Sequence, residues 1–158
     1  MNREQLLNRY AEILHLTGLQ YSQVVIGYGG AMLVLGMREE TSDLDLDISC
    51  MTDFHQCAVE LQKCAEPITK PIYAGDGFII RAPELDADFH HTFVDPYFQD
   101  DVIYDHINQI AYYHPKKILR MKQRLNREKD QKDIKVLEEW IKEKEIEQLM
   151  KRHEDLYG

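Results

Sequence analysis

The amino-acid sequence predicts an α/β protein of the α+β type, with a mixed β-sheet, helices packed against it and further helices near the C-terminal end. In the first half of the chain, apolar residues with helical spacing alternate with short apolar or alternating segments. Strand-like segments then follow one another, and two helix-like segments end the sequence. This order of elements is typical of helices that pack on a sheet of mixed strand direction.

The length and composition are those of one globular domain. The chain has 158 residues, of which 44% are hydrophobic and 30% charged. We expect a single domain over 1–158, with a core of about 1–113 and a C-terminal helical part of about 115–153. No apolar stretch approaches the roughly 20 residues of a membrane span. The three cysteines have no zinc spacing and give no sign of an oxidising compartment. We therefore expect a cytoplasmic protein without a membrane partner.

The first elements are a helix, a strand and a second helix. Residues 3–16 place apolar side chains on one helical face, and Gly18 follows their end. Residues 23–26 are β-branched and apolar, which favours a short buried strand. A helix over 31–35 opens after the pair Gly29-Gly30. The glycine pair therefore lies where a strand turns into a helix.

The next segment alternates strictly between aspartate and apolar residues. Residues 44–48 predict a strand in which Asp43, Asp45 and Asp47 share one face, while the apolar side chains share the other. A helix that carries two of the cysteines follows, capped by Thr52 or Asp53. A loop marked by Pro67, Pro71, Gly75 and Gly77 precedes the next strand. The remaining elements are strands over 78–81, 86–93 and 109–113, with an acidic loop after Pro96, and helices over 115–125 and 130–151.

The charge is distributed unevenly. The formal net charge of −9 argues at first against a nucleic-acid partner. The region 38–115, however, holds sixteen acidic and four basic residues, whereas 116–135 holds nine basic and three acidic residues. An acidic body followed by a basic segment leaves a polyanionic partner open.

The segment that carries chemistry joins the glycine pair to the aspartates. Glycines at the start of a helix let the backbone approach a phosphate. Carboxylates side by side on one strand face repel each other, which favours a divalent cation among them. Gly29 and Gly30, followed by Asp43 and Asp45, therefore predict a metal–nucleotide site. Either feature alone is equally well explained by a tight turn or an exposed edge strand.

Two other motifs fit less well. A dinucleotide fingerprint would require glycine where Met32 stands, and its strands are normally apolar on both faces. A calcium loop would require glycine in place of Ile48 and glutamate in place of Phe54.

The pattern Gly-Gly, apolar run, Gly-x-Arg and Thr-x-Asp-x-Asp resembles the nucleotidyltransferase superfamily with the DNA polymerase β type of catalytic fold. It is most similar to the small abortive-infection type toxins and the lincosamide and aminoglycoside nucleotidyltransferases. The resemblance implies that Gly29, Gly30, Asp43 and Asp45 hold nucleotide and metal. It also implies a third carboxylate on a later strand, for which Asp88 fits best, with Asp86 as the alternative and Asp95 as a weaker one.

The resemblance extends into the basic segment. A lysine at the place of Lys122 faces the nucleotide phosphates in such proteins, and the run from Lys129-Asp130 to Asp133-Ile134 shapes the wall of the cleft. A solvated helical face explains most of the other basic residues. One departure is Gly30, where many relatives have a serine whose hydroxyl is available to a phosphate.

The resemblance implies a two-metal enzyme. We expect two Mg²⁺ ions at Asp43, Asp45 and Asp88, and an NTP, ATP by default, bound with help from Arg38, Thr41 and Lys122. An NMP, AMP by default, would pass to a hydroxyl of tRNA, another nucleic acid or a small molecule, and pyrophosphate would leave.

The alternative is a catalytically idle module of the same fold that binds nucleotide or a protein, for example in a toxin–antitoxin pair. Possible roles for His90 and His91 beside the metal, and for Tyr28 on a base, stay open.

Overall fold

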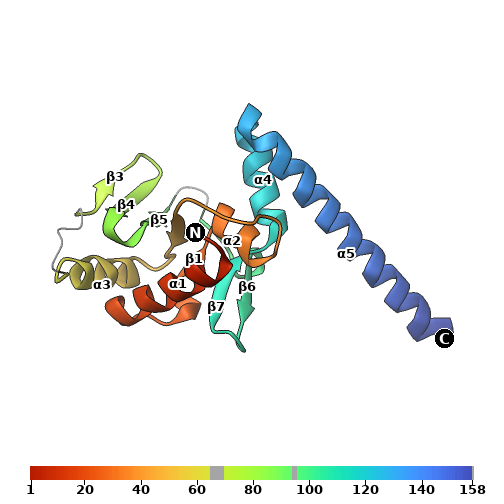
Figure 1. Ribbon diagram of the computed structural model, residues 1–158, viewed down its shortest axis with the longest axis horizontal. Coiled ribbons are helices and arrows are strands. Elements are labelled where there is room, and N and C mark those ends of the chain that lie inside the picture. The colour runs from red at the N-terminus through yellow and green to blue at the C-terminus, as the bar shows by residue number, and fades with distance from the viewer. Residues whose placement is uncertain (65–69, 94–95, 158) are drawn as a thin grey trace. The chain divides into compact units, whose positions relative to one another are not determined.

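The computed structural model describes residues 1–64, 70–93 and 96–157 (Figure 1). The chain divides into two compact units, Met1–His114 and Pro115–Gly158. The division falls where the sequence places the boundary between a core and a C-terminal helical part. The single-domain organisation itself stays a prediction.

A seven-stranded mixed sheet forms the centre of the first unit, which confirms the predicted fold class (Figure 1). The order of strands is β3-β4-β5-β2-β1-β7-β6. Parallel pairing joins β2 to β5 and β1 to β7, and the other neighbours are antiparallel. The strands are β1 (Val25–Ile26), β2 (Leu44–Asp47), β3 (Ile72–Tyr73), β4 (Gly77–Ala82), β5 (Ala87–Thr92), β6 (Val102–Asp105) and β7 (Ile110–Tyr113).

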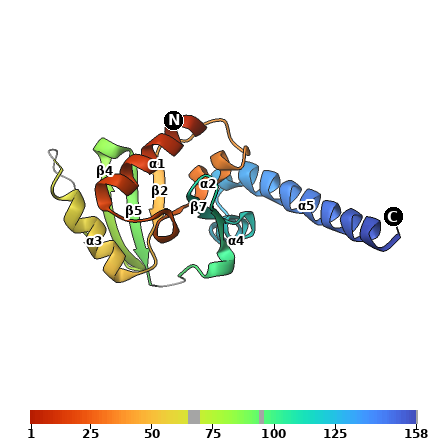
Figure 2. The same ribbon diagram turned by 90° about the horizontal axis from the view of Figure 1, so that it is seen from below.

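Helices α1 (Arg3–Thr17) and α3 (Met51–Leu61) cover one face of this sheet (Figure 2). Asn2 and Gln5 form a capping box at the start of α1, and Gly18 ends the helix with φ of +71°. The helices bury their apolar stripes against the strand side chains that point toward them, among them Leu44, Leu46, Ile80 and Phe89. The opposite face of the same strands carries the polar residues described below.

Helix α2 (Tyr28–Val34) begins three residues before the predicted start. Tyr28 has φ of +41°, a left-handed conformation that is rare for a bulky residue. Gly30 packs closely on the core, because a methyl group there would lie 2.8 Å from Cγ2 of Ile26. Glycine at position 30 thus has a packing reason that is independent of any ligand.

Three expectations about secondary structure need correction. Helix α3 begins at Met51 after Cys50 rather than at a Thr52 or Asp53 cap. The predicted acidic loop after Pro96 contains β6, which pairs with β7 as a hairpin. The expected loop before the 78–81 strand contains β3, a two-residue edge strand whose side chains are exposed. Both strands lie at the edges of the sheet.

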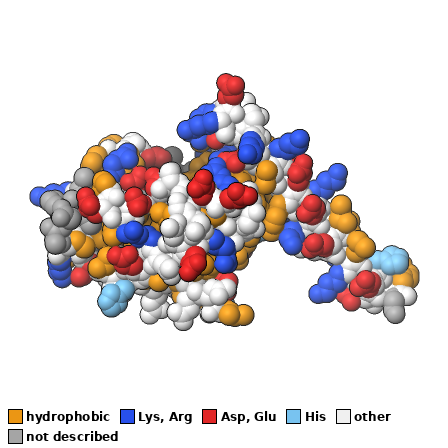
Figure 3. Space-filling view, in the orientation of Figure 1, with side chains coloured by type: hydrophobic (Ala, Val, Ile, Leu, Met, Phe, Trp, Pro, Cys, Tyr) orange, Lys and Arg blue, Asp and Glu red, His pale blue; other side chains and the backbone are white. Residues whose placement is uncertain are grey.

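The second unit consists of α4 (Pro115–Leu125), a short 3₁₀ turn (Glu128–Asp130) and α5 (Gln131–Tyr157). Helices α4 and α5 pack against each other, and Ile118 and Leu137 are fully buried. Acidic and basic side chains alternate along α5 on the face shown in Figure 3. Within the described residues, no helix has the length and apolar character that crossing a bilayer requires.

Candidate metal centre

Asp45 and Asp88 lie directly opposite each other on two neighbouring parallel strands, β2 and β5. Alternation along each strand sets their direction: Leu44, Leu46 and Phe89 point into the core, so both aspartates point to the other face. Asp45 and Asp88 are partly buried. The backbone ladder thus brings together two carboxylates that are 43 positions apart in the sequence.

His90 completes a group of three metal-binding side chains. Its Nε2 lies 3.3 Å from Oδ1 of Asp45. One ligand atom each from Asp45, Asp88 and His90 can be chosen so that all three lie within 4.8 Å of one another. Two carboxylates and an imidazole can hold a divalent cation.

The electrostatics of the group reflect two crowded carboxylates. Burial raises the pKa of Asp88, Arg81 opposes the rise, and the negative charge of Asp45 adds to it. Nη1 of Arg81 lies 3.4 Å from Oδ2 of Asp88. Burial lowers the pKa of His90, but its hydrogen bond with Asp45 and the charges of Asp47, Asp45 and Asp88 outweigh this, so that the pKa is raised. The group therefore favours bound positive charge.

The other two aspartates of the row have different surroundings. Asp43 is exposed, precedes β2 and accepts a hydrogen bond of 3.0 Å from the Ser42 hydroxyl. It lies outside the group of three, although its charge contributes to the raised pKa of Asp88. Asp47 is 6% exposed and accepts a hydrogen bond from the hydroxyl of Tyr113. Of the aspartates that share one face by alternation, only Asp45 belongs to the described group of three.

The alternatives for the third carboxylate are placed differently. Asp86 is exposed at the turn before β5, with φ of +49°, and its backbone oxygen accepts a hydrogen bond from the Leu44 amide. Asp88 is the residue that faces Asp45. Asp95 lies outside the described residues.

Gly29, Arg38 and Thr41 come together as a second cluster. A methyl group at Gly29 would lie 2.9 Å from Nη1 of Arg38 and 3.1 Å from Oγ1 of Thr41. The Thr41 hydroxyl also donates to the backbone oxygen of Asp43 at 3.3 Å, which ties this cluster to the start of β2. A guanidinium and a hydroxyl beside a glycine backbone are groups that can receive a phosphate.

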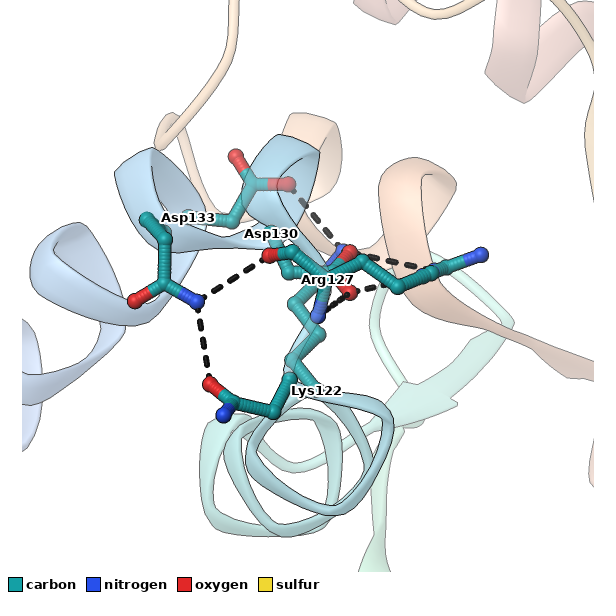
Figure 4. Close-up of polar contacts among 6 residues, drawn as sticks. Lys122, Arg127, Asp130 and Asp133 are labelled. Carbon is teal, nitrogen blue, oxygen red and sulfur yellow. Dashed lines mark hydrogen bonds and ion pairs between the residues drawn. The ribbon is translucent and has the colours of Figure 1, made fainter.

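Lys122 is held within the second unit (Figure 4). Its Nζ lies 3.5 Å from Oδ1 of Asp130 and 3.1 Å from Oδ2 of Asp133. Arg127 donates two hydrogen bonds to Asp130, at 2.7 and 3.0 Å, and these lower the pKa of Asp130 to about 2. Both aspartates of the Lys-Asp-x-x-Asp-Ile run therefore bind Lys122, and the expectation that Lys122 faces phosphates stays a prediction.

Sequence reasoning missed two partners of the aspartates. Arg81 faces Asp88 in the antiparallel register of β4 and β5, and Tyr113 reaches Asp47 from β7. The register of Arg81 could have been found from the two predicted strands, 78–81 and 86–93, if their connecting turn had been counted. No signal in the sequence identifies the contact of Tyr113, because β7 lies two strands away from β2.

Comparison with family models, curated proteins and solved structures finds no match for this chain. The geometry of Asp45, Asp88 and His90 is therefore the observation that bears on function.

Proposed function

We propose that the protein is a metal-dependent nucleotidyltransferase that moves an NMP from an NTP to a hydroxyl acceptor and releases pyrophosphate. The observation that carries the proposal is the register pair of Asp45 and Asp88 on parallel strands, with both carboxylates on one face. The resemblance of Gly29-Gly30 and Asp43-x-Asp45 to that superfamily supports it, with AMP from ATP as the default reaction.

The residues of the group have distinct parts in this reaction. A divalent cation, Mg²⁺ by resemblance, would hold the triphosphate and lower the pKa of the acceptor hydroxyl. Asp45 and Asp88 would bind it, and Asp43 would extend the site to a second ion. The acceptor oxygen forms a bond to the α-phosphorus, the bond from that phosphorus to the β-phosphate oxygen breaks, and pyrophosphate leaves. Asp88 would take the acceptor proton or orient the metal-bound nucleophile.

The cluster around Gly29 would bind the phosphates. Arg38 and Thr41 lie close enough to Gly29 that a side chain there would meet both. The positive guanidinium offsets phosphate charge, and the hydroxyl donates a hydrogen bond. The link from Thr41 to the backbone of Asp43 would place the phosphates beside the carboxylates.

The acceptor is either a nucleic acid such as tRNA or a small hydroxylated molecule. The basic segment 116–135 favours a nucleic acid, whereas the acidic stretch 95–105 favours a small cationic molecule. A salt titration of tRNA binding distinguishes them. Phosphate contacts give a steep loss of affinity as salt rises, and an enzyme for small molecules shows almost no tRNA binding.

A second candidate is the idle module that binds nucleotide or a protein partner without transfer. One observation favours it: Arg81 offers positive charge to Asp88 and His90 lies within hydrogen-bond distance of Asp45, so both carboxylates have a protein partner without a cation.

The test is transfer of label from an α-³²P NTP, together with calorimetry of each NTP with and without Mg²⁺ or Mn²⁺. We expect metal-dependent transfer in the wild type and its loss in Asp45→Asn and Asp88→Asn. Asp76 is exposed on a turn outside the group of three. Asp76→Asn therefore serves as the matched control and should keep full transfer. Circular dichroism verifies that all variants are folded.

Two outcomes would contradict the proposal, the first for the site and the second for the activity. Unchanged transfer in both site variants would remove the two carboxylates from the chemistry. NTP binding that is independent of metal, without any transfer, would favour the idle module.

A further inference from the structure

We propose that His90 is the third protein ligand of the cation at Asp45 and Asp88, and that the site consequently prefers a transition-metal ion such as Mn²⁺ or Co²⁺ over Mg²⁺. The inference rests on the proposed function in one respect, since both place a cation between the two aspartates. It goes beyond that function because the resemblance implies only carboxylate ligands and Mg²⁺.

The distance between the donors fits joint coordination. Metal bonds of about 2.1 Å place neighbouring ligand atoms roughly 3.0 to 3.4 Å apart, for octahedral to tetrahedral angles. Nε2 of His90 lies 3.3 Å from Oδ1 of Asp45. The three donors of Asp45, Asp88 and His90 stay within 4.8 Å of one another, so a single ion can reach all of them with small side-chain adjustments.

The backbone holds these donors in place. Asp88 and His90 are two residues apart on β5 and share a face, while Asp45 pairs with Asp88 across the parallel ladder. Donors on paired strands of a sheet are more firmly positioned than donors on loops. The cation would therefore meet a site whose geometry is set by the fold.

Asp43 is a weaker third ligand than His90. It precedes the strand, is exposed and accepts a hydrogen bond from Ser42. His90 is partly buried and already faces Asp45. Two carboxylates and a neutral imidazole form a donor set with two negative charges, one of which Arg81 beside Asp88 partly offsets.

The nitrogen donor decides the choice of ion. Mg²⁺ strongly prefers oxygen ligands, whereas imidazole suits transition-metal ions, for which the affinity of a mixed site rises from Mn²⁺ to Co²⁺. A site of two carboxylates and one histidine consequently gains more from a transition metal than a site of carboxylates alone. Replacing His90 should remove this selectivity while leaving the carboxylates in place.

Two other histidines provide controls. His91, next in the chain, points to the opposite face, where it is 8% exposed and its Nδ1 lies 2.9 Å from the backbone oxygen of Ile48. It cannot replace His90 without leaving the core. His55 is exposed on α3 and belongs to no group of metal-binding residues in the described part of the chain. His55→Gln is therefore the matched control for His90→Gln.

The experiment is calorimetric titration of the full chain with MnCl₂, CoCl₂ and MgCl₂, with and without a nonhydrolysable NTP. It compares wild type, His90→Gln, His55→Gln and Asp45→Asn. We expect the wild type to bind Mn²⁺ and Co²⁺ at least tenfold more tightly than Mg²⁺. His90→Gln should lose tenfold or more in affinity for Mn²⁺ and Co²⁺ and less than threefold for Mg²⁺. His55→Gln should match the wild type.

The outcomes distinguish this inference from the proposed function. Equal Mn²⁺ affinity in wild type and His90→Gln, with loss in Asp45→Asn, overturns the histidine ligand and leaves the transferase proposal standing. Binding of Mn²⁺ that depends on His90, without any nucleotide transfer, supports the ligand and counts against the transferase. Absence of cation binding by the wild type under both conditions overturns the histidine ligand together with the metal-dependent transferase.

Discussion

The hydroxyl of Tyr113 donates a hydrogen bond to the carboxylate of Asp47, across the strand β1 that lies between them. Burial raises the pKa of Tyr113, and the charge of Asp47 raises it further, so the phenol stays a donor. This contact occupies an oxygen of the most buried aspartate of the 43–47 row. The contact ties that aspartate to the packing of the sheet, while its charge also helps to raise the pKa of His90.

Replacing Tyr113 by phenylalanine should destabilise the protein. The change removes a donor from a carboxylate that is 6% exposed, and loss of one partner of a buried polar group costs about 1–3 kcal/mol. Urea unfolding followed by circular dichroism measures the loss. Tyr104→Phe, a partly buried tyrosine on β6, is the control and should change the free energy of unfolding by less than about 0.5 kcal/mol. Equal effects of the two variants would show that the contact with Asp47 contributes nothing.

Alanine should lower the stability of the protein at Gly30 but leave it almost unchanged at Gly29. At Gly30 the added methyl group would lie 2.8 Å from a buried branched side chain, Ile26, and overpacking of this kind costs about 1–3 kcal/mol. At Gly29 it would lie 2.9 Å from the flexible tip of Arg38 and 3.1 Å from the Thr41 hydroxyl. Both are side-chain ends that can shift, so the stability should change by less than about 0.5 kcal/mol.

Transfer activity separates the two glycines further. Gly29→Ala should lower it, because the methyl group displaces Arg38 and Thr41 from the phosphates. Thermal unfolding and the labelled-NTP assay measure both effects. A stable Gly30→Ala protein, or a fully active Gly29→Ala enzyme, would contradict the respective expectation.

The ion pair between Arg127 and Asp130 should stabilise the helical unit at all but strongly acidic pH. Its hydrogen bonds lower the pKa of Asp130 to about 2, below the ordinary value near 3.9. Because the folded pKa is the lower one, the stabilisation is complete above about pH 4 and is lost as the pH falls toward 2. Urea unfolding at pH 6, 4 and 2.5 should show the wild type more stable than Asp130→Asn at the first two values, with a smaller difference at the last. A difference that does not change with pH would contradict this.

The cysteines should differ strongly in reactivity. Cys50 is exposed, whereas Cys57 is buried in α3 and burial raises its thiol pKa to about 12. With a disulfide reagent at pH 8, Cys50 should react first and Cys57 only after unfolding. Mass spectrometry of peptides at successive times identifies each modified thiol. Equal rates at both positions would mean that α3 opens readily.

The sequence predicted the fold better than the site. The periodicities of 3–16, 44–48 and 115–125 correspond closely to α1, β2 and α4, because amphipathic patterns follow directly from which face is buried. The edge strands β3 and β6 were missed, since the side chains of β3 are exposed and those of β6 do not alternate between buried and exposed.

The prediction of the site was partial for a different reason. Alternation shows that Asp45 and Asp88 each face away from the core, but the parallel register that brings them together depends on strands distant in the sequence. The same holds for Arg81, and for His90, whose role the sequence left open. The burial of Asp47 depends on Tyr113, which no local pattern connects to it.

The strand β5 couples the integrity of the site to that of the core. Phe89 and His91 face inward, whereas Asp88 and His90 face outward. A deletion of one residue between Pro83 and Asp86 that shifted the strand by one position would exchange these sets, bringing a carboxylate and an imidazole into the apolar interior. Such a slip would destroy both core and site at once. Small insertions or deletions in this turn should therefore impair folding, and they should not yield a folded protein with an altered site.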